Sequence, residues 1–182
     1  MSSVNPFGRL APFVQEFVYR QGWKEIRLLQ AQAIDAIFDS DNDILITTGT
    51  ASGKTEAAFL PILSLIAEEP TGSVRVLYIG PLKALINDQF RRLELLCQAG
   101  EIPIHRWHGD VGSSQKYDLI EQPGGVLRIT PESIESLFVN KTNHLHRLFG
   151  GLQFIVVDEV HSFMESDRGV QLRSQLQRIE KY

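Results

Sequence analysis

The chain has 182 residues, of which 43% are hydrophobic and 22% charged, a balance typical of a globular protein rather than a disordered one. Its formal net charge of −4 argues against a basic protein that binds nucleic acid non-specifically, but leaves room for a local basic groove. No apolar run approaches the roughly 20 residues of a membrane span, and no secretory signal is visible. A single cysteine, Cys97, at an apolar helical spacing, predicts a packed thiol in a reduced, cytoplasmic protein.

Apolar periodicity and turn residues predict the elements in chain order. We expect helices over 10–22 and 28–38, a buried strand over 43–47, a helix over 53–69 with an irregularity at Pro61, and a strand over 74–80. There follow a long helix over 82–98, a weaker strand over 103–109, a strand over 125–130, a helix over 131–139, a strand over 153–158 and a final helix over 168–181. The run 153–158 is unbroken and β-branched, which is typical of a central parallel strand.

Alternating strands and helices predict an α/β fold of three layers, with a mostly parallel central sheet covered on both faces. Parallel strands bring their carboxyl ends to one edge, where ligands bind. The loops after residues 47, 80, 109, 130 and 157 are therefore expected to share one rim.

The segment TTGTASGKT (47–55) lies between a predicted strand and a predicted helix, the context that a phosphate-binding loop requires. Thr48 stands where the usual pattern has glycine, and the alternative is a Gly/Ser/Thr turn that only resembles such a loop. Successive backbone amides and the helix N-terminus can surround a phosphate. The candidate phosphate-binding residues are Thr50, Ala51, Ser52, Gly53, Lys54 and Thr55.

Within this loop, Lys54 would reach the β- and γ-phosphates, and the Thr55 hydroxyl would bind Mg²⁺. Ala51 is expected to have a negative φ, because a left-handed backbone would cost it about 1–2 kcal/mol.

Carboxylates follow the strand 153–158 directly. Asp158 can hold Mg²⁺, through water, and Glu159 can polarise an attacking water as a general base. His161 stands two residues further on, where it can relay between a nucleotide and another surface. A solvated turn is the alternative, but the pairing with Gly53-Lys54-Thr55 favours a nucleotide hydrolase.

With these motifs the chain resembles the first RecA-like domain of a superfamily-two helicase of the DEAD/DEAH-box class. Asp158-Glu159-Val160-His161 has the DExH form and is closer to the large-helicase-related type than to strict DEAD-box proteins. The segment GWKEIRLLQ (22–30) is similar to the family's glutamine motif, although Ile26 and Arg27 replace its proline and threonine. The resemblance implies that Gln30 reads the adenine edge and that Arg27 assists.

Further segments resemble the family's nucleic-acid contacts, in the expected order. GPLKALINDQ (80–89) resembles motif Ia, WHGDV (107–111) the next contact, and ITPESI (129–134) motif Ib. A surface lysine, a turn and a capped helix are the alternatives for each segment alone. The candidate contacts are Pro81, Lys83, Gly109, Asp110, Thr130 and Pro131.

The resemblance implies ATP and Mg²⁺ as cofactors and the backbone of DNA or RNA as partner, with DNA weakly preferred and no membrane. We expect residues 1–182 to form a single RecA-like ATP-binding domain, with 1–21 as a helical extension. The family's Ser-Ala-Thr motif and its second RecA-like domain do not occur in these residues. We therefore expect a part of a longer translocase that binds ATP weakly, hydrolyses it very slowly and unwinds nothing alone. The alternatives are a non-enzymatic module that binds nucleic acid or a partner, and another phosphate-loop ATPase such as a transporter or recombinase motor.

Overall fold

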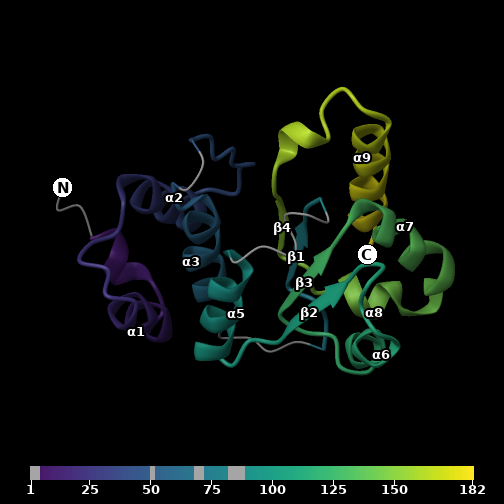
Figure 1. The fold of residues 1–182 in the computed structure, drawn as a ribbon, viewed down its shortest axis with the longest axis horizontal. Coiled ribbons are helices and arrows are strands. Elements are labelled where there is room, and N and C mark those ends of the chain that lie inside the picture. Colours follow the sequence, from purple (N-terminus) through teal and green to yellow (C-terminus); the bar gives the residue numbers. More distant parts are fainter. Residues whose placement is uncertain (1–4, 50–51, 68–71, 82–88) are drawn as a thin grey trace. The chain divides into compact units, whose positions relative to one another are not determined.

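The computed structural model describes residues 5–49, 52–67, 72–81 and 89–182 (Figure 1). The chain forms two compact units. The first comprises Met1–Glu69 and Arg91–Glu101, and the second comprises Pro70–Phe90 and Ile102–Tyr182. In the described part of the chain, none of the helices has the length and apolar character needed to cross a bilayer.

The regular secondary structure described in the first unit is all helical. It contains η1 (Pro6–Arg9), α1 (Pro12–Arg20), α2 (Leu28–Asp39), α3 (Lys54–Ile66) and most of α5 (Gln89–Ala99). These helices confirm the predicted ones, except that residues 82–88 of the predicted long helix lie outside the described residues. Pro61 lies buried inside α3, which continues through it, and Cys97 is fully buried as expected.

The predicted strand over 43–47 is not formed. Residues 43–49 have no regular secondary structure, and Leu45 is 75% exposed. A strand needs a neighbour to satisfy its backbone groups, and the four described strands all belong to the second unit, whereas this segment belongs to the first. The prediction of a buried, paired strand over 43–47 is therefore wrong for the described structure.

The second unit is built on a parallel sheet. Its strands are β1 (Val76–Ile79), β2 (Ile104–Trp107), β3 (Val126–Ile129) and β4 (Phe154–Val157), in the order β2-β3-β1-β4. Ile79 is in register with Ile129 and Val157, and Ile129 with Trp107, so the four strands end level. The predicted shared rim is therefore confirmed for the residues that follow these strands.

The prediction that 153–158 is a central strand is wrong for the described sheet. β4 lies at the edge of the four strands, and its Ile155 is 38% exposed. An unbroken apolar run reports that both faces of a strand can be buried, but it does not report the position of that strand in the sheet.

Helices cover the sheet of the second unit. They are α6 (Ser113–Glu121), α7 (Pro131–Asn140), α8 (Leu145–Phe149) and α9 (Asp167–Ile179), with 3-10 turns η2 (Thr142–His144) and η3 (Val160–Ser162). The sequence predicted α7 and α9 but not α6 or α8. The segment HLHRLF, which contains α8, was interpreted only as a polar face. The apolar core joins the sheet to these helices through Leu77, Ile79, Leu127, Ile129, Ile134, Leu137, Leu172 and Ile179.

Candidate functional site

The N-terminus of α3 lies in the segment that the sequence predicts to bind phosphate. Gly53 is its N-cap, with φ 86° and ψ 32°, a left-handed conformation that a residue with a Cβ adopts only at a cost of about 1–2 kcal/mol. No side chain among the described residues caps this helix, so its first amides remain available to an anion. The Ser52 hydroxyl is buried and has no hydrogen-bond partner in the described part of the chain. These features fit a phosphate group.

The Lys54 ammonium group lies over the same loop. Its Nζ donates hydrogen bonds to the carbonyl oxygens of Thr48, at 3.0 Å, and Gly49, at 3.2 Å. A phosphate bound at the helix N-terminus would compete for these donors. Thr50 and Ala51 lie outside the described residues, as does the prediction that Ala51 has a negative φ.

The glutamine motif lies beside this loop. A Cβ built on Gly53 would be 3.0 Å from Gln30 Nε2 and 3.7 Å from Arg27 Nη1. Gln30 is 2% exposed, and its Oε1 accepts a hydrogen bond of 2.9 Å from the Arg27 amide at the start of α2. The structure thus brings together three residues that the sequence assigned to one nucleotide: Gly53, Gln30 and Arg27.

In the second unit, Asp158 follows β4 and is held on both carboxylate oxygens. Tyr78 Oη donates to Oδ2 at 2.5 Å, and the Glu159 amide donates to Oδ1 at 2.9 Å. Burial raises the pKa of the Tyr78 hydroxyl far above its ordinary value, and the Asp158 charge raises it further. The hydroxyl therefore keeps its proton and acts as a fixed donor. This orientation suits a carboxylate that binds a divalent cation.

Glu159 has a left-handed backbone, with φ 50° and ψ 42°, immediately before η3. A non-glycine residue in this region stores roughly 1–2 kcal/mol of strain, and such strain concentrates at functional sites. Its Oε2 lies 3.2 Å from Nε2 of His161, and both side chains are exposed to solvent. The two predicted catalytic groups of this motif are therefore adjacent.

The carboxyl ends of β2 and β3 border a hollow of about 390 Å³. Gly109 and Thr130 line it, as do His108 and Lys116, which the sequence did not single out. The Lys116 ammonium lies 5.8 Å from the ring centroid of Trp107, a cation–π arrangement that holds a positive charge at the hollow. Burial lowers the pKa of His108, so its ring is mainly neutral at pH 7.

The other predicted nucleic-acid residues are placed less directly. Thr130 is the N-cap of α7, 5% exposed, and its Oγ1 accepts a hydrogen bond of 3.3 Å from the Ser133 amide. Pro131 is buried at the first position of α7. Asp110 is exposed beside His108 and is not part of the lining of the hollow. Lys83 lies outside the described residues, and Pro81 is half-buried after β1.

Comparison with known proteins decides the family. The family model for DEAD/DEAH box helicases matches residues 27–182. The chain belongs to the DEAD/DEAH box helicase family. Of the two relatives described next, one is named a Lhr helicase and the other an ATP-dependent helicase, which agrees with the predicted helicase family of enzymes.

Two curated relatives of this helicase chain illustrate the match. A Lhr helicase/probable uracil glycosylase of Mycolicibacterium smegmatis is 31% identical over 99% of the chain and 13% of the relative. An ATP-dependent helicase Lhr-Core of Methanothermobacter thermautotrophicus is 33% identical over 94% of the chain and 21% of the relative. The chain thus spans only about a fifth or less of the length of these relatives.

Solved structures agree on the fold. The Mycobacterium smegmatis helicase Lhr bound to ssDNA and AMP-PNP matches with a TM-score of 0.80 and 30% identity, over 98% of this chain and 24% of that one. The DEAD-box helicase Mss116 bound to ssRNA and UDP-BeF matches with a TM-score of 0.77 and 18% identity, over 92% of this chain and 34% of that one. The second likeness supports the RecA-like fold alone.

The sequence did not predict two residues that contact the motif segments, Tyr78 and Lys116. Tyr78 places a hydroxyl in the otherwise aliphatic strand VLYI, and this hydroxyl was the signal that could have identified it. Lys116 lies on α6, a helix that was not predicted. Such side chains become visible only when the register of the sheet is known.

Proposed function

We propose that the chain binds ATP with Mg²⁺ and one strand of nucleic acid, as the ATP-binding part of an ATP-dependent helicase or translocase. The observation that carries the proposal is the left-handed Gly53 at the uncapped N-terminus of α3, beside the buried Gln30. The 30% identity to a helicase solved with ssDNA and AMP-PNP supports both ligands. The proposal takes residues 1–182 as one RecA-like ATP-binding domain, with 1–21 as a helical extension.

The chemistry divides among the motif residues. Residues 50–54 would bind the phosphates, with Lys54 as the point charge, and Gln30 and Arg27 would contact adenine. Mg²⁺, bound by Thr55 and Asp158, would neutralise charge on the phosphates. Glu159 would accept the proton of the attacking water, and His161, 3.2 Å from its carboxylate, would steady it.

Hydrolysis would require a second RecA-like domain that supplies an arginine to the transition state. Such an arginine contributes about 10³-fold or more to the rate. We therefore propose that these 182 residues bind ATP but turn it over very slowly.

The single-stranded nucleic acid would lie along the rim of the parallel sheet. It would contact the protein mainly through its sugar–phosphate backbone. A phosphate in the hollow lined by Gly109, Thr130 and Lys116 would lie near one ammonium group. Pro81, Lys83, Asp110 and Pro131 are further proposed contacts or neighbours of the strand. We propose DNA rather than RNA from the resemblance to large-helicase-related proteins, and cytoplasmic action from the single cysteine, Cys97, which fits a reduced setting.

The test is equilibrium binding of a fluorescent, non-hydrolysable ATP analogue in the presence of Mg²⁺. The substitution Lys54→Ala is expected to weaken binding by at least about tenfold, the worth of one hydrogen bond from a charged group. The matched control Lys181→Ala removes an exposed lysine of the second unit and should leave the Kd unchanged. Equal binding by both variants would refute the nucleotide site.

Parallel titrations with single-stranded DNA and RNA of the same sequence then test the partner. Tighter binding of RNA would overturn the DNA assignment. Strand binding together with no binding of the analogue would favour the non-enzymatic module instead.

A further inference from the structure

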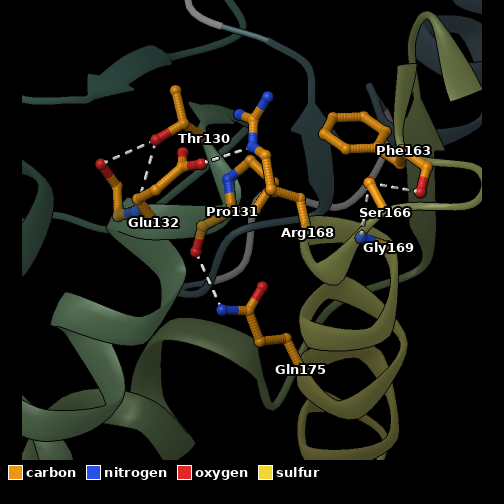
Figure 2. Close-up of polar contacts among 9 residues, drawn as sticks. Thr130, Pro131, Glu132, Phe163, Ser166, Arg168, Gly169 and Gln175 are labelled. Carbon is orange, nitrogen blue, oxygen red and sulfur yellow. Dashed lines mark hydrogen bonds and ion pairs between the residues drawn. The ribbon is translucent and has the colours of Figure 1, made fainter.

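Helices α7 and α9 are tied together at the end of α7 that carries Thr130. Arg168 Nε lies 2.7 Å from Oε1 of Glu132 (Figure 2). Glu132 is the second residue of α7. Burial opposes ionisation of Glu132, but its own backbone amide and Arg168 outweigh this effect and hold its pKa below the ordinary value. The pair is therefore charged on both sides at neutral pH.

A second contact fixes the same end of α7. Gln175 of α9 is fully buried, and its Nε2 donates a hydrogen bond of 2.9 Å to the carbonyl oxygen of Pro131 (Figure 2). A buried amide that satisfies a backbone carbonyl is costly to break, because both groups would lose their partner out of reach of water. Movement of the N-terminal turn of α7 away from α9 would therefore break this hydrogen bond.

The N-terminus of α9 is in turn fixed to the turn that follows Glu159. Ser166 Oγ donates 2.9 Å to the carbonyl oxygen of Phe163 and accepts from the Gly169 amide. A Cβ on Gly169 would lie only 2.0 Å from that same carbonyl oxygen, so the two backbones touch. The Arg168 guanidinium lies 5.4 Å from the Phe163 ring centroid, and Phe163 is 3% exposed in the core.

These contacts form one path within the second unit: from Thr130, the N-cap of α7, and Glu132 in its first turn to Arg168 on α9 and Phe163 after η3. The backbone of η3 completes the path, since the Phe163 amide donates to the carbonyl oxygen of Val160, the residue after Glu159. We infer that Arg168 is a positioning residue that couples the nucleic-acid rim at Thr130 to the Asp158-Glu159 motif. Its guanidinium group is the only group along this path that both pairs with α7 and lies against the turn after η3, among the contacts of the described residues. The inference rests on the proposed function, since coupling needs both ligands.

Coupling of two ligands is reciprocal and is measured as a ratio of affinities. A strand that binds at the Thr130 end of α7 would bias the position of α9, and through Phe163 the position of Glu159. The nucleotide analogue with Mg²⁺ would then change the affinity for single-stranded nucleic acid by some factor. The nucleic acid would change the affinity for the analogue by the same factor. Typical factors are about 5–150.

The experiment measures the Kd of a labelled single-stranded DNA with and without a saturating, non-hydrolysable ATP analogue and Mg²⁺. The unaltered chain is expected to show a ratio of about fivefold or more. Arg168→Gln should bring the ratio below about twofold, and Arg168→Lys, which keeps the charge opposite Glu132, should retain an intermediate ratio.

The matched control is Arg178→Gln. Arg178 pairs with Glu135 at 3.0 Å and so joins the same two helices further from Thr130. This variant should keep the ratio of the unaltered chain. Circular dichroism of all variants checks that the fold survives the substitution.

The outcomes separate the two ideas. If the unaltered chain binds both ligands but shows a ratio of one, or if Arg168→Gln keeps the full ratio, the role of Arg168 is overturned. A lysine variant as poor as the glutamine variant would overturn the role of the ion pair with Glu132. If the unaltered chain binds neither ligand, the proposed function fails, and the coupling fails with it.

Discussion

At the scale of single residues, the main addition of the structure is the fixed orientation of Asp158. Its two oxygens accept from Tyr78 Oη and from the Glu159 amide. A carboxylate held in this way loses little conformational entropy when it binds a cation, because folding has already fixed its orientation. The same arrangement explains why an aromatic hydroxyl lies within a buried aliphatic strand.

Removal of that hydroxyl by Tyr78→Phe should leave the ring packed but free the Asp158 carboxylate to rotate. We expect the Mg²⁺ concentration for half-maximal binding of the ATP analogue to rise roughly tenfold, the size typical when a group that orients a ligand is lost. The free energy of unfolding should fall by about 1–2 kcal/mol in urea titrations. Tyr117→Phe, at a tyrosine that is 63% exposed, is the control and should change neither value.

The sequence predicted the site residues that belong to motifs, but not the residues that contact those motifs from distant parts of the chain. Gly53 was predicted from the pattern of its loop, and Gln30 and Arg27 from the resemblance to the glutamine motif; the structure places them together because the N-termini of α2 and α3 are adjacent. Tyr78 and Arg168 were not identified as site residues, because their partners are 80 and 36 residues away in the chain. Such pairs depend on strand register and helix packing, which no local pattern specifies.

At the scale of elements, the link between η3 and α9 depends on a glycine whose role is close approach rather than an unusual φ. The carbonyl oxygen of Phe163 occupies the space where a Cβ of residue 169 would lie, at 2.0 Å. The contact brings the N-terminal turn of α9 against the end of the Asp158-Glu159 turn. A larger residue would push the two elements apart.

The substitution Gly169→Ala tests this packing. Alanine favours a helix by up to about 1 kcal/mol over glycine, but the overlap with a backbone atom should dominate and lower the free energy of unfolding by about 1–3 kcal/mol. Gly72→Ala is the control, since a Cβ there would meet nothing within 4 Å. Equal stability of the two variants in urea unfolding would show that η3 and α9 are not held in close contact.

At the scale of the whole molecule, alternation of strands and helices predicted the α/β class and most element positions, since periodicity reports which faces are buried. It did not predict that 43–49 would remain unpaired and exposed, because pairing depends on which unit supplies a neighbouring strand. It also missed α6, whose apolar residues Leu119 and Ile120 are adjacent rather than spaced along a helical stripe.

The net charge of −4 also affects the electrostatics of binding to an anionic nucleic acid. Long-range attraction is unfavourable, so binding must depend on a few local cations and on backbone amides. Lys116, held over Trp107 at the hollow, is one such cation. For single strands, each phosphate neutralised contributes about −0.7 to the slope of log K against log salt concentration. The total slope should therefore be small.

Lys116→Gln should weaken strand binding to a similar extent for all base sequences and reduce the magnitude of the salt slope by about 0.7, because one phosphate contact is lost. The measurement is a series of single-stranded DNA titrations between low and physiological salt, with Lys181→Gln as the control at an exposed lysine. The uniform loss follows from contact with the sugar–phosphate backbone rather than with base edges. An unchanged slope in the Lys116 variant would place the strand away from this hollow, and a loss confined to certain base sequences would mean that Lys116 reads bases.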